Sequence, residues 1–260
     1  WVCHASPLSP KGMCTPGTCT IYSQTELLHE ILEDRAETHA EVWSCDDFTP
    51  GADPFPACDW DLRSGPNWGW NNIAGTQDPE GTGTALRVFY PEGSYVGHPD
   101  QGDMRSGSQW YHHNYGSYDE LKLEDDVYFS ENLDFVVGGN LPGFYGGEGS
   151  CSGGLYDDCF SSRFMWRSEG RLEIYGYVPA EECVWFCGDD PCPLTVCDFN
   201  FGHSFGRGAA SLTVGKWHTI RQYIRMNDVG SANGVMRYYL DGSLRYEITG
   251  LTLRQISTVQ

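Results

Sequence analysis

Apolar and polar residues alternate along most of the chain after residue 84, which is the pattern of strands with one buried face. The alternation runs through eight segments, residues 85–90, 108–112, 121–129, 163–166, 172–178, 217–226, 235–240 and 244–248. Asp241-Gly242 separates the last two segments and is a strong hairpin signal. Strands of this number and spacing predict an all-β fold, a two-sheet antiparallel sandwich of the β-jelly-roll type.

The first 60 residues differ from the rest of the chain. Ser23-Gln24-Thr25-Glu26 matches a helix capping box. Apolar residues follow it at helical spacing, at Leu27, Leu28, Ile31, Leu32 and Ala36. This pattern predicts an amphipathic helix of about 14 residues. We therefore expect a Cys-rich, partly helical segment over residues 1–60 and a β-jelly roll over residues 61–260.

Eleven cysteines in 260 residues indicate an oxidising compartment, so we expect a secreted, extracellular protein with disulfide bonds. Cys183, Cys187, Cys192 and Cys197 offer zinc as an alternative. Structural zinc sites favour close cysteine pairs followed by a long gap, and the prolines between these cysteines suit a disulfide-bonded loop better. The sequence does not give the pairing, and the odd count leaves one cysteine that is free or bonded to another chain.

Charge narrows the choice of partners. The net charge is −20, with only 16 Lys and Arg residues, which argues against nucleic acid because phosphate binding requires clustered cations. No apolar run approaches the roughly 20 residues of a membrane span. An acidic polymer can bind such a protein only where the surface is locally basic. We expect no cofactor and no metal site.

Two segments carry the candidate chemistry. Residues 135–147 contain five glycines and one proline, which allow bulges or a close backbone approach at the wall of a groove, or simply a connecting loop. Further on, Ser161 and Arg163 share one face of a predicted strand, and Tyr175 and Tyr177 share one face of the next. Pairing the two strands through the turn at residues 168–170 would bring the arginine to the tyrosines.

Arginine and tyrosine on one face suit a polymer of uronic acids. A guanidinium holds a carboxylate by paired hydrogen bonds, and a phenol can donate or remove a proton. Without further information, a solvated face with aromatic cross-strand pairs explains the same residues, and both interpretations stay open. Gln109 and Tyr111 share a face of an earlier predicted strand and are candidates for lining the same groove.

The combination of these segments resembles polysaccharide lyase family 14, which includes alginate lyases and lyases acting on glucuronate polymers. The similarity rests on Gly-Gly-x-Leu-Pro-Gly at 138–143, Ser-x-Arg-x-Met-Trp-Arg at 161–167 and Tyr-x-Tyr at 175–177, and it extends over residues 83–260. The resemblance implies a β-jelly roll with a substrate groove. It also implies catalytic roles for Ser161, Arg163, Tyr175 and Tyr177 in β-elimination, where a uronate C5 proton is removed and cations neutralise the developing charge.

The sequence departs from the family pattern at two places. Val137 and Asn140 stand where the resemblance places lysines, and the chain stops before a further glycine-aromatic strand, so the jelly roll is expected to be incomplete. Asn140, Gln109, Tyr111 and Arg167 are predicted to bind substrate, with Arg167 as a replacement cation. Our leading hypothesis is a carbohydrate-binding or structural protein that is weakly active or non-catalytic, with a protein partner or self-assembly through the C-terminal edge or the odd cysteine. The alternative is an active polyuronate lyase.

Overall fold

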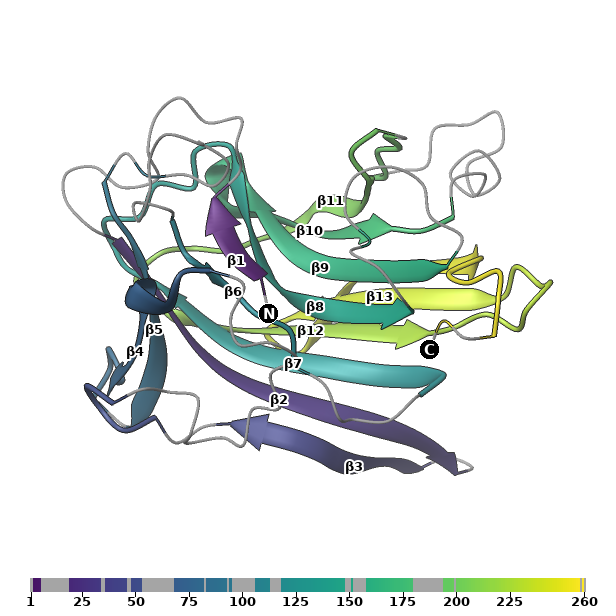
Figure 1. Cartoon of the computed structure of the whole chain (residues 1–260), viewed down its shortest axis with the longest axis horizontal. Helices are drawn as coiled ribbons and strands as arrows, with labels where there is room; N and C mark the ends of the chain where they lie inside the picture. Colours follow the sequence, from purple (N-terminus) through teal and green to yellow (C-terminus); the bar gives the residue numbers. More distant parts are fainter. Residues whose placement is uncertain are drawn as a thin grey trace.

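The computed structural model shows two antiparallel β-sheets packed face to face (Figure 1). It describes residues 2–5, 19–33, 36–45, 48–52, 68–81, 83–92, 94, 106–112, 118–147, 151, 158–179, 194–198, 200–257 and 259. For β1 and β2, and for β3 apart from Cys45, it describes the backbone only. The predicted all-β sandwich is confirmed.

One sheet has six strands and the other has eight. The six-stranded sheet runs in the order β11 (His203–Ser211), β10 (Arg171–Tyr177), β9 (Cys159–Arg167), β8 (Gly138–Gly147), β1 (Val2–Ala5) and β6 (Ser108–Gln109). The eight-stranded sheet contains β14 (Ser243–Leu251), β13 (Gly234–Leu240), β12 (Trp217–Arg225), β7 (Glu120–Phe129), β2 (Cys19–Glu33), β5 (Thr84–Tyr90) and β4 (Ile73–Gln77), with β3 (Ala36–Cys45) pairing with β2. Short 3₁₀ turns lie at Trp70–Asn72 and Ser168–Gly170.

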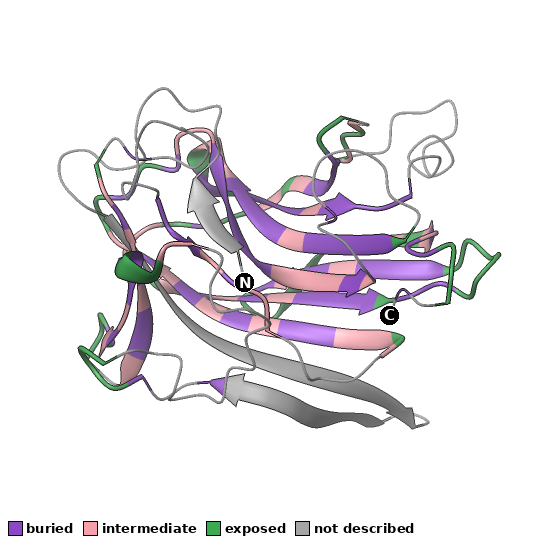
Figure 2. Cartoon of the chain, in the orientation of Figure 1, coloured by how far each residue is buried: buried purple, intermediate pink, exposed green. Residues whose placement is uncertain are grey.

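The core fills the space between the two sheets. Large aromatic side chains dominate it and meet edge to face: the Phe129 and Trp166 rings lie 5.5 Å apart, and the Phe164 and Tyr238 rings lie 6.0 Å apart. All four side chains are fully buried. Burial alternates along the strands in Figure 2, as expected when one face of each strand packs on the core. The apolar residues of the alternating segments therefore form the core between the two sheets, as predicted.

The helix predicted over residues 23–36 is wrong. Of these residues, 23–33 belong to β2 and residue 36 begins β3, and the two strands pair antiparallel. β2 pairs with β7 over eight residue pairs from Ile21 to Leu28 and with β5 along its other edge. A capping pattern and helical spacing are local preferences, and the hydrogen bonds offered by strands about 60 and 100 residues away outweigh them.

The glycine-rich segment and two further stretches are strands that alternation did not predict. Residues 138–147 form β8, residues 203–211 form β11, and residues 73–77 form β4. β8 pairs with β9 along its length, with a register shift between Asn140 and Gly143. Of the alternatives left open for this segment, residues 138–147 form a paired strand with a local irregularity and not a connecting loop.

The described cysteines support the disulfide prediction. Cys151 and Cys159 form a disulfide, and Cys45 and Cys197 are also disulfide-bonded. A disulfide at Cys197 removes that residue from the alternative zinc set, and the other three cysteines of that set lie outside the described residues. In the described part of the chain, no helix is long and apolar enough to cross a membrane.

Candidate functional site

The predicted site lies on the face of the six-stranded sheet turned away from the core, called here the site face. Alternate residues of β9 and β10 point to it, while Phe164 and Trp166 point into the core. Cross-strand partners share a face, so the register identifies neighbouring side chains. Three rows cross β8, β9 and β10: Tyr145, Ser161 and Tyr177; Gly143, Arg163 and Tyr175; and Asn140, Met165 and Glu173. The predicted pairing of the arginine strand with the tyrosine strand is confirmed.

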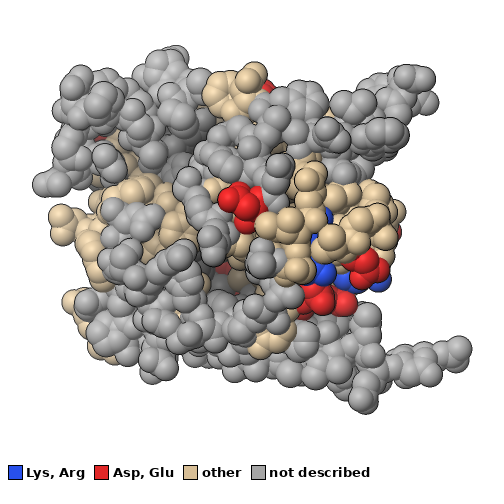
Figure 3. Space-filling view, turned by 45° about the vertical axis from the view of Figure 1, so that its right-hand side comes forward, with Lys and Arg blue, Asp and Glu red and all other residues tan. Residues whose placement is uncertain are grey.

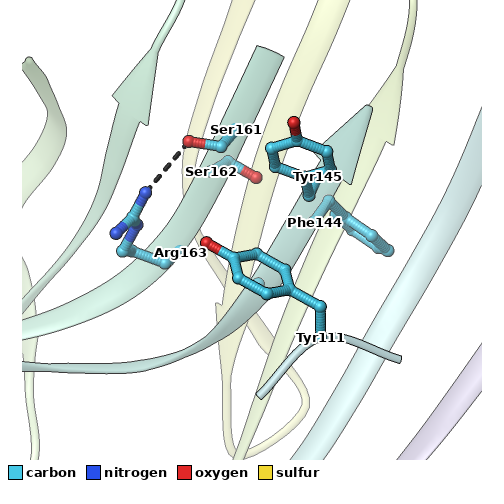
Figure 4. A pocket seen from close by; sticks show the side chains of 7 residues that line it. Tyr111, Phe144, Tyr145, Ser161, Ser162 and Arg163 are labelled. Carbon is cyan, nitrogen blue, oxygen red and sulfur yellow. Dashed lines mark hydrogen bonds between the residues drawn. The ribbon is translucent and has the colours of Figure 1, made fainter. Parts of the chain in front are cut away.

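Arg163 is held by neighbouring groups on the site face. Its Nη2 donates a hydrogen bond to Ser161 Oγ at 3.0 Å (Figure 4). Ser161 Oγ in turn donates to the Cys151 carbonyl oxygen at 3.0 Å. Its guanidinium carbon lies 5.1 Å from the centroid of the Tyr177 ring. Burial lowers the pKa of Arg163 from its ordinary value, and nearby tyrosines partly oppose that effect. Because arginine stays protonated in proteins, Arg163 presents a positioned cation.

Tyr175 and Tyr177 form an edge-to-face pair, with ring centroids 5.6 Å apart. Both pack on a small cluster that includes the Cys151–Cys159 disulfide. The Tyr175 hydroxyl donates a hydrogen bond to the Phe201 carbonyl oxygen. Burial, and then the neighbouring Tyr177, raise the pKa of Tyr175 above its ordinary value. Tyr175 therefore keeps its proton at neutral pH, as a proton donor requires.

A small open pocket connects this arrangement to the segment after β6. It is lined by Tyr111, Gly143, Phe144, Tyr145, Ser161, Ser162 and Arg163. In Figure 4 the Tyr111 hydroxyl points toward Arg163, and the Tyr111 and Tyr145 ring centroids lie 5.6 Å apart. Gln109 Nε2 donates to the Tyr111 hydroxyl at 3.3 Å. Tyr111 therefore lines the pocket, whereas Gln109 does not line it and contacts the Tyr111 hydroxyl instead.

Gly143 allows β8 to approach β9 closely at the pocket. A Cβ atom added at Gly143 would lie 1.9 Å from the Ser162 carbonyl oxygen and 2.3 Å from the Arg163 Cα atom. Both are backbone atoms and cannot move aside as a flexible side chain could. Glycine is therefore required where β8 passes the arginine of the site.

Replacing Gly143 with alanine is expected to lower the thermal stability and to displace Arg163. Overpacking of this kind costs about 1–3 kcal/mol, and the clash here is with backbone. Gly83→Ala is the matched control, because a Cβ there meets nothing within 4 Å. Thermal unfolding followed by circular dichroism compares the two variants. Equal melting temperatures for Gly143→Ala and Gly83→Ala would contradict the close approach.

Asn140 lies in the row next to Arg163 and Tyr175, as the partner of Met165. It is 5% exposed and also pairs with β1 on its other side. Val137 immediately precedes β8 and is half-buried. The structure therefore brings Asn140 to the site face, next to the arginine and the tyrosines. The replacement of family lysines at these two positions stays a prediction.

Three side chains form an ionic cluster beside Tyr175 that sequence reasoning did not identify as a unit. Glu173 is fully buried, and its carboxylate accepts hydrogen bonds from Arg167 Nε at 2.8 Å and Arg207 Nε at 2.6 Å. Ser204 Oγ donates to the same carboxylate at 3.2 Å. The guanidinium carbon of Arg167 lies 5.5 Å from the Tyr175 ring centroid. Arg167 therefore lies on the site face, but its guanidinium is already paired with the Glu173 carboxylate.

Comparison with known proteins gives this arrangement its context. A family model for polysaccharide lyase 14 matches residues 78–260, a range that contains every strand from β5 to β14. The crystal structure of the marine family 14 alginate lyase from Aplysia kurodai is 31% identical, with a TM-score of 0.70, over 84% of this chain and 85% of that chain. The chain belongs to polysaccharide lyase family 14. The family resemblance read from the sequence is confirmed.

Two other solved structures share less with this family 14 chain. The alginate lyase from Chlorella virus is 16% identical with a TM-score of 0.45, over 59% of this chain and 64% of that chain. The endo-β-1,4-glucuronan lyase from the fungus Trichoderma reesei is 15% identical with a TM-score of 0.33, over 52% of this chain and 63% of that chain. Likeness at this level adds no argument about the site. No curated protein sequence matches the chain.

Most residues predicted for the site come together in the structure. Ser161, Arg163, Tyr175, Tyr177 and Asn140 occupy adjacent positions on β8, β9 and β10. Tyr111 lines the pocket beside Arg163, Gln109 contacts it only through a hydrogen bond to the Tyr111 hydroxyl, and Arg167 lies farther along β9. Their catalytic and binding roles stay predictions.

Proposed function

We propose that the chain binds a uronate-containing polysaccharide on the site face and cleaves it slowly by β-elimination. The observation that carries the proposal is the adjacency of Arg163, Tyr175 and Tyr177, with the guanidinium held by Ser161. Membership of family 14 and the likeness to an alginate lyase support the same class of substrate. Alginate and glucuronan are the two polymers of that class to be tested.

The residues of the site face fit the steps of β-elimination. Arg163 holds the C6 carboxylate of a uronate and stabilises the negative charge that develops when the C5 proton leaves. Tyr177, which lies against the Arg163 guanidinium, acts as the base in its phenolate form: the phenolate oxygen accepts that proton and becomes a neutral phenol. The electron pair forms the C4–C5 double bond, and the bond from C4 to the glycosidic oxygen breaks. Tyr175, whose raised pKa keeps it protonated, donates a proton to the departing oxygen.

Asn140 favours a second candidate function, which is binding without turnover. It occupies the site face next to Arg163 and is uncharged, and the family resemblance places a lysine at this position. Removing one preorganised electrostatic group from an active site costs about 10²–10³ in rate. In this second candidate function, a chain that lacks this cation binds acidic sugars through its arginines without cleaving them.

Secretion and assembly belong to the same proposal. The disulfide-bonded cysteines support an oxidising compartment, where disulfides form and persist. β14 lies at one end of the eight-stranded sheet, and an end strand leaves backbone groups for pairing with another chain. Binding sugar in an extracellular structure is consistent with both features.

The function is tested by incubating the purified chain at high concentration with alginate and with glucuronan. Ultraviolet absorbance of the unsaturated uronate product is expected to rise slowly with at least one polymer, and binding is measured in parallel by calorimetry. Binding without any rise in absorbance would select the second candidate. A chain that neither binds nor cleaves either polymer would contradict both functions.

A further inference from the structure

The six-stranded sheet is a basic part of a strongly acidic protein. Its strands β8, β9, β10 and β11 contain four arginines, Arg163, Arg167, Arg171 and Arg207, but one acidic residue, Glu173. The chain as a whole has a net charge of −20. On the other sheet, Arg221 pairs with Glu124 and Arg237 with Glu247, and Figure 3 shows cations and acids side by side at one end of the molecule. The excess of cations on this sheet therefore calls for an explanation beyond Arg163.

The cluster around Glu173 contains two of these cations and one anion. Glu173 is fully buried, so its carboxylate needs a charged partner to offset the loss of solvation. Arg167 meets this need through Nε at 2.8 Å and Nη2 at 2.5 Å. Arg207 adds a second cation on the other carboxylate oxygen, at 2.6 Å. Neutralising Glu173 accounts for one arginine, and among the described residues neither arginine forms an ion pair with any other acidic side chain, which leaves one positive charge unbalanced there.

The unbalanced charge has donors left for a ligand. A guanidinium carries five N–H groups in a planar fork. Arg207 uses Nε on Glu173 and Nη2 on Ser204 Oγ, and among the described residues its Nη1 makes no hydrogen bond. Its side chain is 34% exposed. Glu173 thus acts as a buried anchor that orients two guanidinium groups and leaves the outer edge of Arg207 accessible.

The position of the cluster sets which group of the polymer it could meet. Arg167 follows Arg163 by four residues on the same face of β9, which corresponds to about 13 Å along the strand. That separation is longer than one sugar residue. A carboxylate at the Arg167–Arg207 cluster therefore belongs to a different sugar from the one held by Arg163.

We propose that Arg167 and Arg207, oriented by Glu173, form a second anion site that binds the carboxylate of a further uronate in the same chain. The inference rests on the proposed function and specifies it: the site face requires substrates long enough to reach both arginine positions. Short oligomers reach Arg163 alone, and longer ones gain a second charge-assisted contact. The affinity is therefore higher for longer substrates, while the chemical step at Arg163 is the same for all lengths.

Arg207→Gln tests this inference, with Arg237→Gln as the matched control. Arg237 is also paired with one glutamate, and its side chain is 35% exposed, but it lies on β13 of the other sheet. KM and kcat are measured for alginate and glucuronan oligomers of increasing length, with calorimetric Kd values for any oligomer that is not cleaved. Arg207→Gln is expected to raise KM or Kd about tenfold for long oligomers alone and to leave kcat unchanged. Arg207→Lys, which keeps the charge, should recover part of the loss.

The possible outcomes separate this inference from the proposed function. If the unaltered chain binds long oligomers and both glutamine variants do so equally, the second anion site is wrong and the function stands. If Arg207→Gln weakens all lengths alike or lowers the melting temperature and kcat together, the cluster serves the fold and not the ligand. If the unaltered chain neither binds nor cleaves any oligomer, the proposed function fails and the inference fails with it.

Discussion

Replacing Arg163 with glutamine is expected to lower kcat on polyuronate by about 10²–10³, the usual effect of removing one preorganised electrostatic group. The guanidinium donates to Ser161 and lies against Tyr177, so it is already placed when substrate arrives. Arg163→Lys should keep the charge but lose the planar fork, and an intermediate rate is expected. Initial rates from ultraviolet absorbance, with melting temperatures for each variant, make the measurement.

Arg221→Gln is the matched control for Arg163. Arg221 lies on β12 of the other sheet, its guanidinium carbon is 5.7 Å from the Tyr239 ring centroid, and it pairs with Glu124. It shares the arginine–tyrosine contact of Arg163 but not its position on the site face. If kcat falls equally after both substitutions, or if it falls after neither of them, Arg163 has no specific catalytic role.

Replacing Asn140 with lysine is expected to raise kcat by about 10², because it adds a cation to the row next to Arg163 and Tyr175. The position is 5% exposed, and burial lowers the pKa of a lysine, so the gain should be greatest at neutral and lower pH, where the ammonium is protonated. Val137→Lys serves for comparison, since Val137 lies just before β8 and outside the row. Rates at several pH values are measured for both variants.

The outcome at Asn140 also separates the two proposed functions. A large increase in rate would show that the uncharged side chain limits turnover in the natural protein. No increase in a folded Asn140→Lys variant would remove the missing cation as the reason for slow turnover. Cleavage at ordinary enzyme rates by the unaltered chain would contradict the proposal that this member of the family is weakly active or non-catalytic.

The pairing of β9 with β10 could be predicted because everything that defines it is local. Ser161, Arg163, Tyr175 and Tyr177 alternate correctly along their strands, and a three-residue turn fixes the register between them. The face that each side chain occupies then follows from the two-residue repeat. Local alternation and turn length were sufficient for this part of the site.

The Glu173 cluster could not be predicted because its third residue, Arg207, lies on β11, which pairs irregularly with β10. The register between β10 and β11 shifts between Leu172 and Ile174, so simple alternation does not place Arg207 opposite Glu173. The error at residues 23–36 has a related origin. Strand β2 forms because it pairs with β7 and β5, two strands that lie far from it in the sequence. The helical pattern of its own residues gives no sign of that pairing.

The two-residue repeat of β9 also restricts how this scaffold can diversify in evolution. Arg163 lies on the site face, and Phe164 and Trp166 on the same strand are fully buried in the core. Inserting or deleting a single residue within β9 would exchange the two faces of the strand downstream of the change. Function and folding would be lost in the same step, with no viable intermediate. New specificities in this lineage are therefore expected from point substitutions on β9 and from length changes in the connections between strands.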